Sequence, residues 1–209
     1  MNPTGTRDLI LDAVERLIGN LGYSKTTMDD VARAAGVGKR TIYAHFPSKE
    51  EVVLCTIDRI VARLVERLRE HAARTGPAAA RLRAMLVERV LFRFDSVRDY
   101  SHGLDELFAS LRPAYLARRE RYFAAEADVF ADVLRAAHRA GELGAPDPPA
   151  AAEALLLATN SLLPYALSAR ELGRRVDVEG RVVRVAELLL FGLCRPRQSR
   201  AKPPVKLRR

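Results

Sequence analysis

Apolar side chains recur at intervals of three and four residues along most of the 209-residue chain, which is the spacing of one face of an α-helix. The first such stretch runs from Asp8 to Leu21 and ends at Gly22, a residue type typical of helix C-termini. Glycines and prolines cluster between long stretches that contain neither, and few segments alternate like a strand. The pattern therefore predicts an all-α protein of helices joined by short turns.

Two short helices are predicted to follow the first one. Thr26 begins the earlier of them, with Asp29 three residues later as the partner in a capping box, and Gly36 ends it. The later one runs from about Lys39 to Ala44, and Pro47 closes the unit. The N-terminal part of the chain is therefore expected to fold as three compact helices.

Six further helices bring the predicted count to nine. A connecting helix begins at a second capping box, Ser48 with Glu51, and meets no Gly or Pro before Gly76. The others cover about residues 78–94, 104–111, 113–141, 147–172 and 177–194. Pro164 is expected to kink the helix that contains it.

The formal net charge of +9 is concentrated at the C-terminus. From Arg195 onward there are seven Lys and Arg and no acid, whereas the preceding 194 residues hold 28 basic and 26 acidic side chains. This tail is expected to be disordered, and it either solubilises the protein or adds sequence-independent attraction to phosphates, with solubilisation favoured. The overall charge therefore carries no argument for DNA binding.

Several classes of protein are disfavoured by composition. The two cysteines, Cys55 and Cys194, have no metal-type spacing, which suits a reducing cytoplasm, and the N-terminus has no apolar signal segment. The longest uncharged run, Ala154 to Ala169, is shorter than the roughly 18–20 residues that a membrane span needs. We expect a cytoplasmic protein with no metal, no cofactor and no membrane partner.

A helix-turn-helix makes specific demands on side-chain size, and this sequence meets them. Where the second helix crosses the first, a small side chain is needed, and Ala32 is one. The sharp turn four residues later favours a glycine, Gly36, and an apolar residue must then return to the core, as Ile42 does. The segment from Thr26 to Phe46 is therefore predicted to be a helix-turn-helix.

The same segment resembles the DNA-binding signature of the TetR family of transcriptional regulators. The residues that carry the resemblance are Thr27, Val31-Ala32, Ala35-Gly36-Val37, Thr41-Ile42-Tyr43, Phe46 and Lys49-Glu50. It covers about Ile10 to Val53, and the nine-helix layout extends it less specifically to residue 194. The resemblance implies a homodimer with DNA-binding domains at residues 1–47, effector-binding and dimerisation domains at 48–194 (connecting helix 48–75), and the basic tail at 195–209.

The resemblance also implies which residues contact double-stranded DNA. The N-terminal residues of the second helix of such a motif lie nearest the bases in the major groove. Arg40 is the expected base reader, because its guanidinium can donate two hydrogen bonds to guanine O6 and N7. The full set of predicted DNA contacts is Thr27, Gly38, Lys39, Arg40, Thr41, Tyr43, His45 and Lys49. Phe46 is expected in the core, and Tyr43 is expected half-buried with its hydroxyl exposed.

The C-terminal part is expected to bind an effector and a second copy of the chain. By resemblance, the last two helices form the dimer interface, through a stripe at Val178, Val182, Val185 and Leu189, although these residues could instead close a monomer core. Candidate effector contacts are Phe92, His102, Phe108, Tyr115, Tyr122 and Asn160. Each aromatic is individually expected to be a core residue more often than a ligand contact. Asn160 needs a polar partner, because it interrupts an apolar run.

The predicted function is a DNA-binding repressor that binds a palindromic operator as a dimer and is released by a small, largely apolar effector. An enzyme is not expected, because the histidines lack metal-type spacing and no nucleophile elbow or phosphate loop is present. The alternative is a helical enzyme, or a protein-partner-binding module, on a TetR-like scaffold.

Overall fold

The structure is a computed structural model that describes residues 5–98, 104–145, 147–164 and 173–192, with the backbone alone given for 97–98 and 104–110. These residues form α-helices and one short 3₁₀ turn, and no strand occurs among them. The elements are α1 (Thr6–Leu21), α2 (Met28–Ala35), α3 (Lys39–His45), α4 (Lys49–Ala72), α5 (Ala78–Arg98), α6 (Leu104–Arg139), α7 (Pro148–Thr159), η1 (Asn160–Leu162) and α9 (Arg175–Phe191). The predicted all-α class is confirmed.

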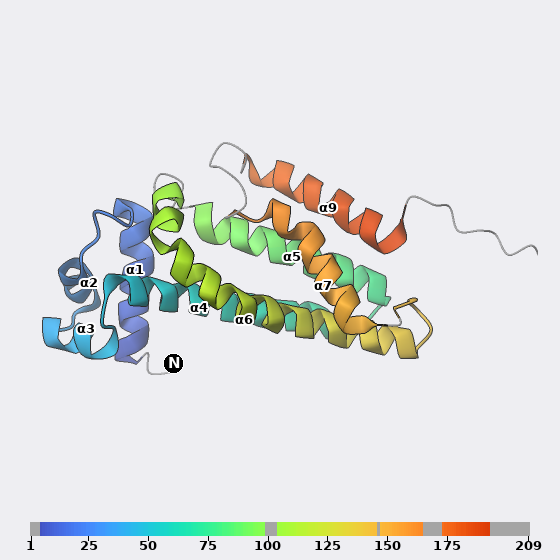
Figure 1. The fold of residues 1–209 in the computed structure, drawn as a ribbon, viewed down its shortest axis with the longest axis horizontal. Coiled ribbons are helices and arrows are strands. Elements are labelled where there is room, and N and C mark those ends of the chain that lie inside the picture. Colours follow the sequence, from blue (N-terminus) through green and yellow to red (C-terminus); the bar gives the residue numbers. More distant parts are fainter. Residues whose placement is uncertain (1–4, 99–103, 146, 165–172, 193–209) are drawn as a thin grey trace, which may run out of the picture.

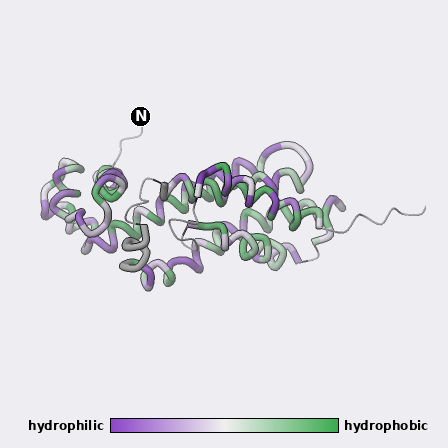
Figure 2. The backbone as a smooth tube through the Cα atoms, turned by 90° about the horizontal axis from the view of Figure 1, so that it is seen from above, coloured by the Kyte–Doolittle hydropathy of each residue, from purple (hydrophilic) through white to green (hydrophobic). Residues whose placement is uncertain are grey.

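The molecule is elongated, with α1, α2 and α3 gathered at one end (Figure 1). We call these three helices the head, and α5, α6, α7 and α9 the body. Helix α4 begins in the head and runs the length of the body beside α5 and α6, and α9 packs along α5. Hydrophobic and hydrophilic residues alternate along the helices (Figure 2), as expected when one face of each is buried.

The head encloses an apolar core of its own. Ile42 of α3 and Phe46 just after it are fully buried against residues of α1 and α2. Val52 and Val53 from the start of α4 and Leu111 from α6 complete this cluster. The head core is therefore closed partly by side chains that follow Pro47 in the sequence.

The body departs from the predicted helices at two prolines. Residues 104–139 form one helix, α6, with Pro113 inside it, where the sequence predicted two. A proline within a helix removes one backbone hydrogen bond, and here the long flanks that pack on α4 and α7 keep the helix continuous. The two helices predicted for residues 104–111 and 113–141 are therefore one, and the described residues contain eight α-helices.

The second departure is at Pro164. Helix α7 ends at Thr159 and passes through η1, whereas the sequence predicted a kinked helix reaching residue 172. Leu163 has an extended backbone (φ −83°, ψ 147°), the conformation that the ring of a following proline imposes. Pro164 thus follows the end of the helix rather than kinking it, and residues 165–172 lie outside the described ranges. Within those ranges, no helix is long and apolar enough to cross a membrane.

Candidate DNA-binding site

The first helix of the motif begins one residue later than predicted. Thr27, not Thr26, is the N-cap of α2, and its hydroxyl accepts a hydrogen bond from the Asp30 backbone N–H at 3.2 Å. The Asp30 carboxylate accepts from the Thr27 N–H and hydroxyl, at 3.1 and 2.6 Å, which completes a capping box. These hydrogen bonds lower the pKa of Asp30. Thr26 is instead buried and donates its hydroxyl to the Gly22 carbonyl at 2.8 Å.

The turn between α2 and α3 has the predicted geometry. Gly36 adopts a left-handed conformation (φ 69°, ψ 28°), which a residue with a Cβ rarely does, and it caps the end of α2. Ala32 is buried where the two helices meet, and Val37 is half-buried in the turn. The short side chain at Ala32 and the glycine turn together allow α3 to pack across α2.

Helix α3 has one buried face and one exposed face. Ile42 points into the head core, and Phe46 follows it there, as predicted. Tyr43 is 45% exposed, in agreement with the expected half-buried ring. The predicted DNA contacts on the exposed side are Gly38, Lys39, Arg40, Thr41, Tyr43 and His45. Burying Ile42 therefore leaves Arg40 exposed on the opposite side of α3.

Two neighbouring basic residues at the start of α3 differ in whether they have an acidic partner. The Lys39 Nζ lies 3.0 Å from both carboxylate oxygens of Asp29 on α2. This hydrogen bond raises the pKa of Lys39. Arg40 is exposed and forms no hydrogen bond or ion pair with any residue that the structure describes. Of the two, Arg40 is therefore free to donate to DNA without breaking a contact.

The contact groups of Thr27 and Lys49 are already engaged. The hydroxyl and N–H of Thr27 are used by its capping box. Lys49 donates to the Tyr23 carbonyl at 3.0 Å, and its Nζ lies 4.1 Å from the centre of the Tyr23 ring, so it anchors the loop before α2. A phosphate contact at either position would compete with these bonds, and the DNA role of both residues stays a prediction.

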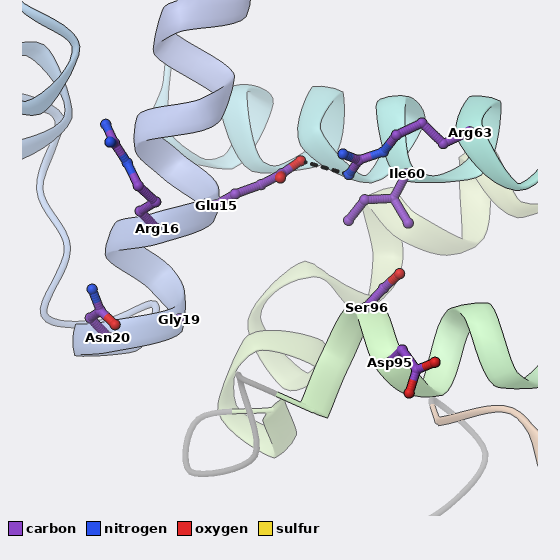
Figure 3. A pocket seen from close by; sticks show the side chains of 8 residues that line it. All are labelled: Glu15, Arg16, Gly19, Asn20, Ile60, Arg63, Asp95 and Ser96. Atoms are coloured by element: carbon purple, nitrogen blue, oxygen red, sulfur yellow. Dashed lines mark hydrogen bonds and ion pairs between the residues drawn. The ribbon is translucent and has the colours of Figure 1, made fainter. Parts of the chain in front are cut away.

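Ion pairs fix the head to α4. Arg59 of α4 lies 2.7 Å from Asp12 and 2.8 Å from Glu15 on α1, and Arg63 lies 3.0 Å from Glu15. A cleft of about 630 Å³ opens next to these residues, between α1, α4 and the end of α5 (Figure 3). Charged and polar side chains, Asp95 and Ser96 among them, line most of it. This cleft does not fit an apolar effector.

The structure brings only some of the predicted effector residues together. The rings of Tyr115 and Tyr122 lie 6.2 Å apart, and the Tyr122 hydroxyl donates to Asp58 of α4. Burial and the Asp58 carboxylate raise the pKa of Tyr122. Phe92 lines a different, charged cleft, of about 340 Å³, beside α4 and α9. His102 lies outside the described residues, and so does the side chain of Phe108.

Asn160 has the polar partner that its sequence context required. Its Oδ1 accepts a hydrogen bond from Arg89 of α5 at 2.7 Å. Arg89 is almost fully buried and also donates to Glu126 of α6 at 2.6 Å and to the Thr159 hydroxyl at 2.8 Å. Asn160 is therefore part of a buried polar network that joins α5, α6 and the end of α7.

Sequence reasoning missed the other members of this network. Glu126 is fully buried and paired with Arg93 as well as Arg89. Burial acts to raise the pKa of Glu126, but the two guanidinium groups outweigh it and hold that pKa below its usual value. A signal was available, because Arg89 lies three and four residues beyond Leu86 and Met85 on the apolar stripe of α5. A charge on such a stripe indicates a buried partner.

A capped first helix, a left-handed glycine turn and a second helix with an exposed polar face define a helix-turn-helix DNA-binding protein. Comparison with known proteins agrees. A family model described as "Bacterial regulatory proteins, tetR family" matches residues 10–54, which contain the whole motif. In the part of the chain that is described, no group of three or more His, Cys, Asp or Glu could hold a metal ion.

Curated relatives match this chain over less than half of their own length. The HTH-type transcriptional regulator BetI of Rhizobium meliloti is 37% identical over 91 residues, 43% of each chain. The HTH-type transcriptional activator FasR of Mycolicibacterium smegmatis is 35% identical over 102 residues, 49% of this chain and 45% of the relative. The matches thus span less than half the length of these relatives, and the relatives are regulators rather than enzymes.

Solved structures extend the likeness to the body. A TetR/AcrR-family regulator from Thermobifida fusca is 27% identical, with a TM-score of 0.67, over 90% of this chain and 98% of that one. A regulator from Cytophaga hutchinsonii, 21% identical, superposes with a TM-score of 0.73 over 88% of this chain and 95% of that one, and shares the fold. With the family-model match over residues 10–54 in the head, these findings agree with the predicted resemblance to the TetR family.

Proposed function

We propose that this protein is a transcriptional regulator that inserts α3 into the major groove of a palindromic operator, with Arg40 reading a guanine. The observation that carries the proposal is the state of α3: Ile42 anchors it in the head core, while Arg40 on its exposed side has no partner among the described residues. A guanidinium held in this way keeps its fork of donors available for O6 and N7 of a guanine.

The proposed operator complex contains two copies of the chain. Of the stripe predicted for the dimer interface, Val178 and Val182 are buried against α5 within one chain. The exposed apolar residues of α9 are Val176, Leu188, Leu189 and Phe191. Three of these, Leu188, Leu189 and Phe191, are gathered near the end of α9, and such a group on a surface helix supports an interface with a second copy. A two-fold dimer would place two α3 helices on one palindrome.

The dimer proposal has its own test. Phe191→Glu and Leu188→Glu are expected to convert the dimer to a monomer in sedimentation velocity, because each places a charge on the apolar end of α9. Leu116→Glu changes a residue of similar exposure on α6 and serves as the control. A dimer that persists in both α9 variants would contradict this interface.

We also propose that the protein represses transcription and that a small, largely apolar effector releases it from DNA. A structure of FadR from Bacillus subtilis in complex with stearoyl-CoA, 18% identical, supports the capacity of this fold to hold a ligand with a long apolar chain. The effector would favour a conformation in which the heads no longer match the operator spacing, so operator affinity falls. The name of FasR, an activator, makes activation the second candidate.

The direct test is selection from a random DNA library with the full chain. We expect enrichment of a palindrome whose half-sites are centred one helical turn, about 10 base pairs, or a multiple of it apart. A reporter placed behind that operator then separates repression from activation. A protein that enriches no sequence would contradict the regulator and favour the protein-partner-binding alternative.

A further inference from the structure

The exposed side of α3 begins with two consecutive basic residues, only one of which is held by an acid. The Asp29 carboxylate belongs to the first turn of α2 and approaches Lys39 across the helix-turn-helix, with both oxygens 3.0 Å from Nζ. The Lys39 side chain is 67% exposed and that of Asp29 is 54% exposed. The pair is therefore solvated, and Lys39 directly precedes Arg40 at the start of α3.

This ion pair contributes little to folding. Exposed pairs stabilise a protein by about 0–1 kcal/mol, because water screens them and ordering two long side chains costs entropy. The head core and the Thr27 cap already fix α2 relative to α3. The carboxylate of Asp29 is thus not needed to hold the motif together.

The same carboxylate has a direct effect on DNA binding. Each lysine that neutralises a phosphate releases a counterion and strengthens binding to any DNA sequence. Lys39 can give its full charge to a phosphate only after it leaves Asp29. Arg40 is unpaired among the described residues and carries no such cost. Asp29 therefore weakens the phosphate contact of Lys39, which does not depend on sequence, and leaves the base contact of Arg40 unaffected.

We propose that Asp29 limits the affinity of the head for DNA by holding Lys39, so that discrimination by Arg40 accounts for a larger share of binding. This inference rests on the proposed function. It identifies Asp29 as a specificity-determining residue, although the residue itself contacts no DNA in the proposal.

The test is a double-mutant cycle with Asp29→Asn and Lys39→Gln in the full-length protein. Dissociation constants are measured by fluorescence anisotropy for the selected operator and for a scrambled duplex of equal length, over a range of salt concentrations. Asp29→Asn is expected to tighten binding to the scrambled duplex about three- to tenfold and to steepen its salt dependence, by about 0.9 in log–log slope for each new phosphate contact. In the Lys39→Gln background, Asp29→Asn is expected to change binding less than twofold.

Glu50→Gln is the matched control, because it removes an exposed acid in the first turn of α4 that does not pair with Lys39. It reports the general effect of net charge and is expected to change binding less than Asp29→Asn. An Asp29→Asn effect of equal size with and without Lys39, or no larger than that of Glu50→Gln, would overturn the inference while leaving the regulator intact. If neither wild type nor Asp29→Asn binds any duplex at low salt, the proposed function itself fails, and the inference with it.

Discussion

The head and the body of this protein differ in whether charged side chains are buried in their cores. The head has an apolar core around Ile42 and Phe46, and its charges lie outside. The body has a larger apolar core, but it also buries Arg89 and Glu126 next to Thr159. A buried ion pair is costly to desolvate and stabilises only when every partner is in place. The head should therefore tolerate charge changes that would unfold the body.

The largest expected effect is in the body. Glu126→Ala leaves Arg89 and Arg93 buried without their shared carboxylate and is expected to lower the free energy of unfolding by about 3–5 kcal/mol. Urea denaturation followed by circular dichroism measures this. The double variant Arg89→Met, Glu126→Leu replaces the Arg89–Glu126 pair by apolar groups and should recover part of the loss, since Arg93 still lacks Glu126. A Glu126→Ala protein as stable as wild type would remove the contrast between head and body.

In the head, the comparable change is the loss of apolar volume. Ile42→Ala removes a fully buried side chain and is expected to cost about 2–5 kcal/mol, with loss of DNA binding because α3 loses its anchor. Thr41→Ala lies on the exposed side of the same helix and should change stability by no more than about 0.5 kcal/mol. If the two variants unfold at the same urea concentration, α3 does not depend on the head core.

Acid should destabilise the body through its buried carboxylate. The pKa of Glu126 is lower in the folded protein than in the unfolded chain, where it is about 4.3. The stabilisation that ionised Glu126 provides is therefore fully present above about pH 4.3. It is lost as the pH falls through the lower pKa that Glu126 has in the folded protein. Urea midpoints measured between neutral and acid pH should fall more steeply for wild type than for Arg89→Met, Glu126→Leu. Equal slopes would contradict this assignment.

The smallest expected effect is at the start of α2. Thr27→Ala removes the hydroxyl of the capping box and is expected to lower the free energy of unfolding by about 1 kcal/mol. Ser48→Ala, which removes the cap of α4, should have a similar effect. A Thr27→Ala protein as stable as wild type would contradict the assignment of Thr27 as the cap of α2.

The sequence was informative wherever a structural requirement is local. Gly36 and Ile42 were identified because the turn and the return to the core lie within one short segment. The residue that caps α2 was not identified, because Thr26 with Asp29 and Thr27 with Asp30 show the same spacing. The burial of Thr26 decides in favour of Thr27.

The body could be predicted only in part, because its polar contacts join distant residues. Asn160 was expected to need a partner, but Arg89 lies 71 residues away, and no spacing rule links the two. The end of α7 was missed because the extended backbone before Pro164 outweighed the helical pattern of the apolar run. Phe92 was grouped with Tyr122 by residue type, although the helices place them in different clefts.

The central claim is that the exposed side of α3 reads DNA through Arg40, and one measurement tests it most directly. Wild type and Arg40→Ala are compared on the selected operator and on operators with single base-pair changes. The account predicts that Arg40→Ala stays folded and dimeric but loses discrimination at one guanine of each half-site, worth about 1–3 kcal/mol. Discrimination at every position equal to that of wild type would contradict it.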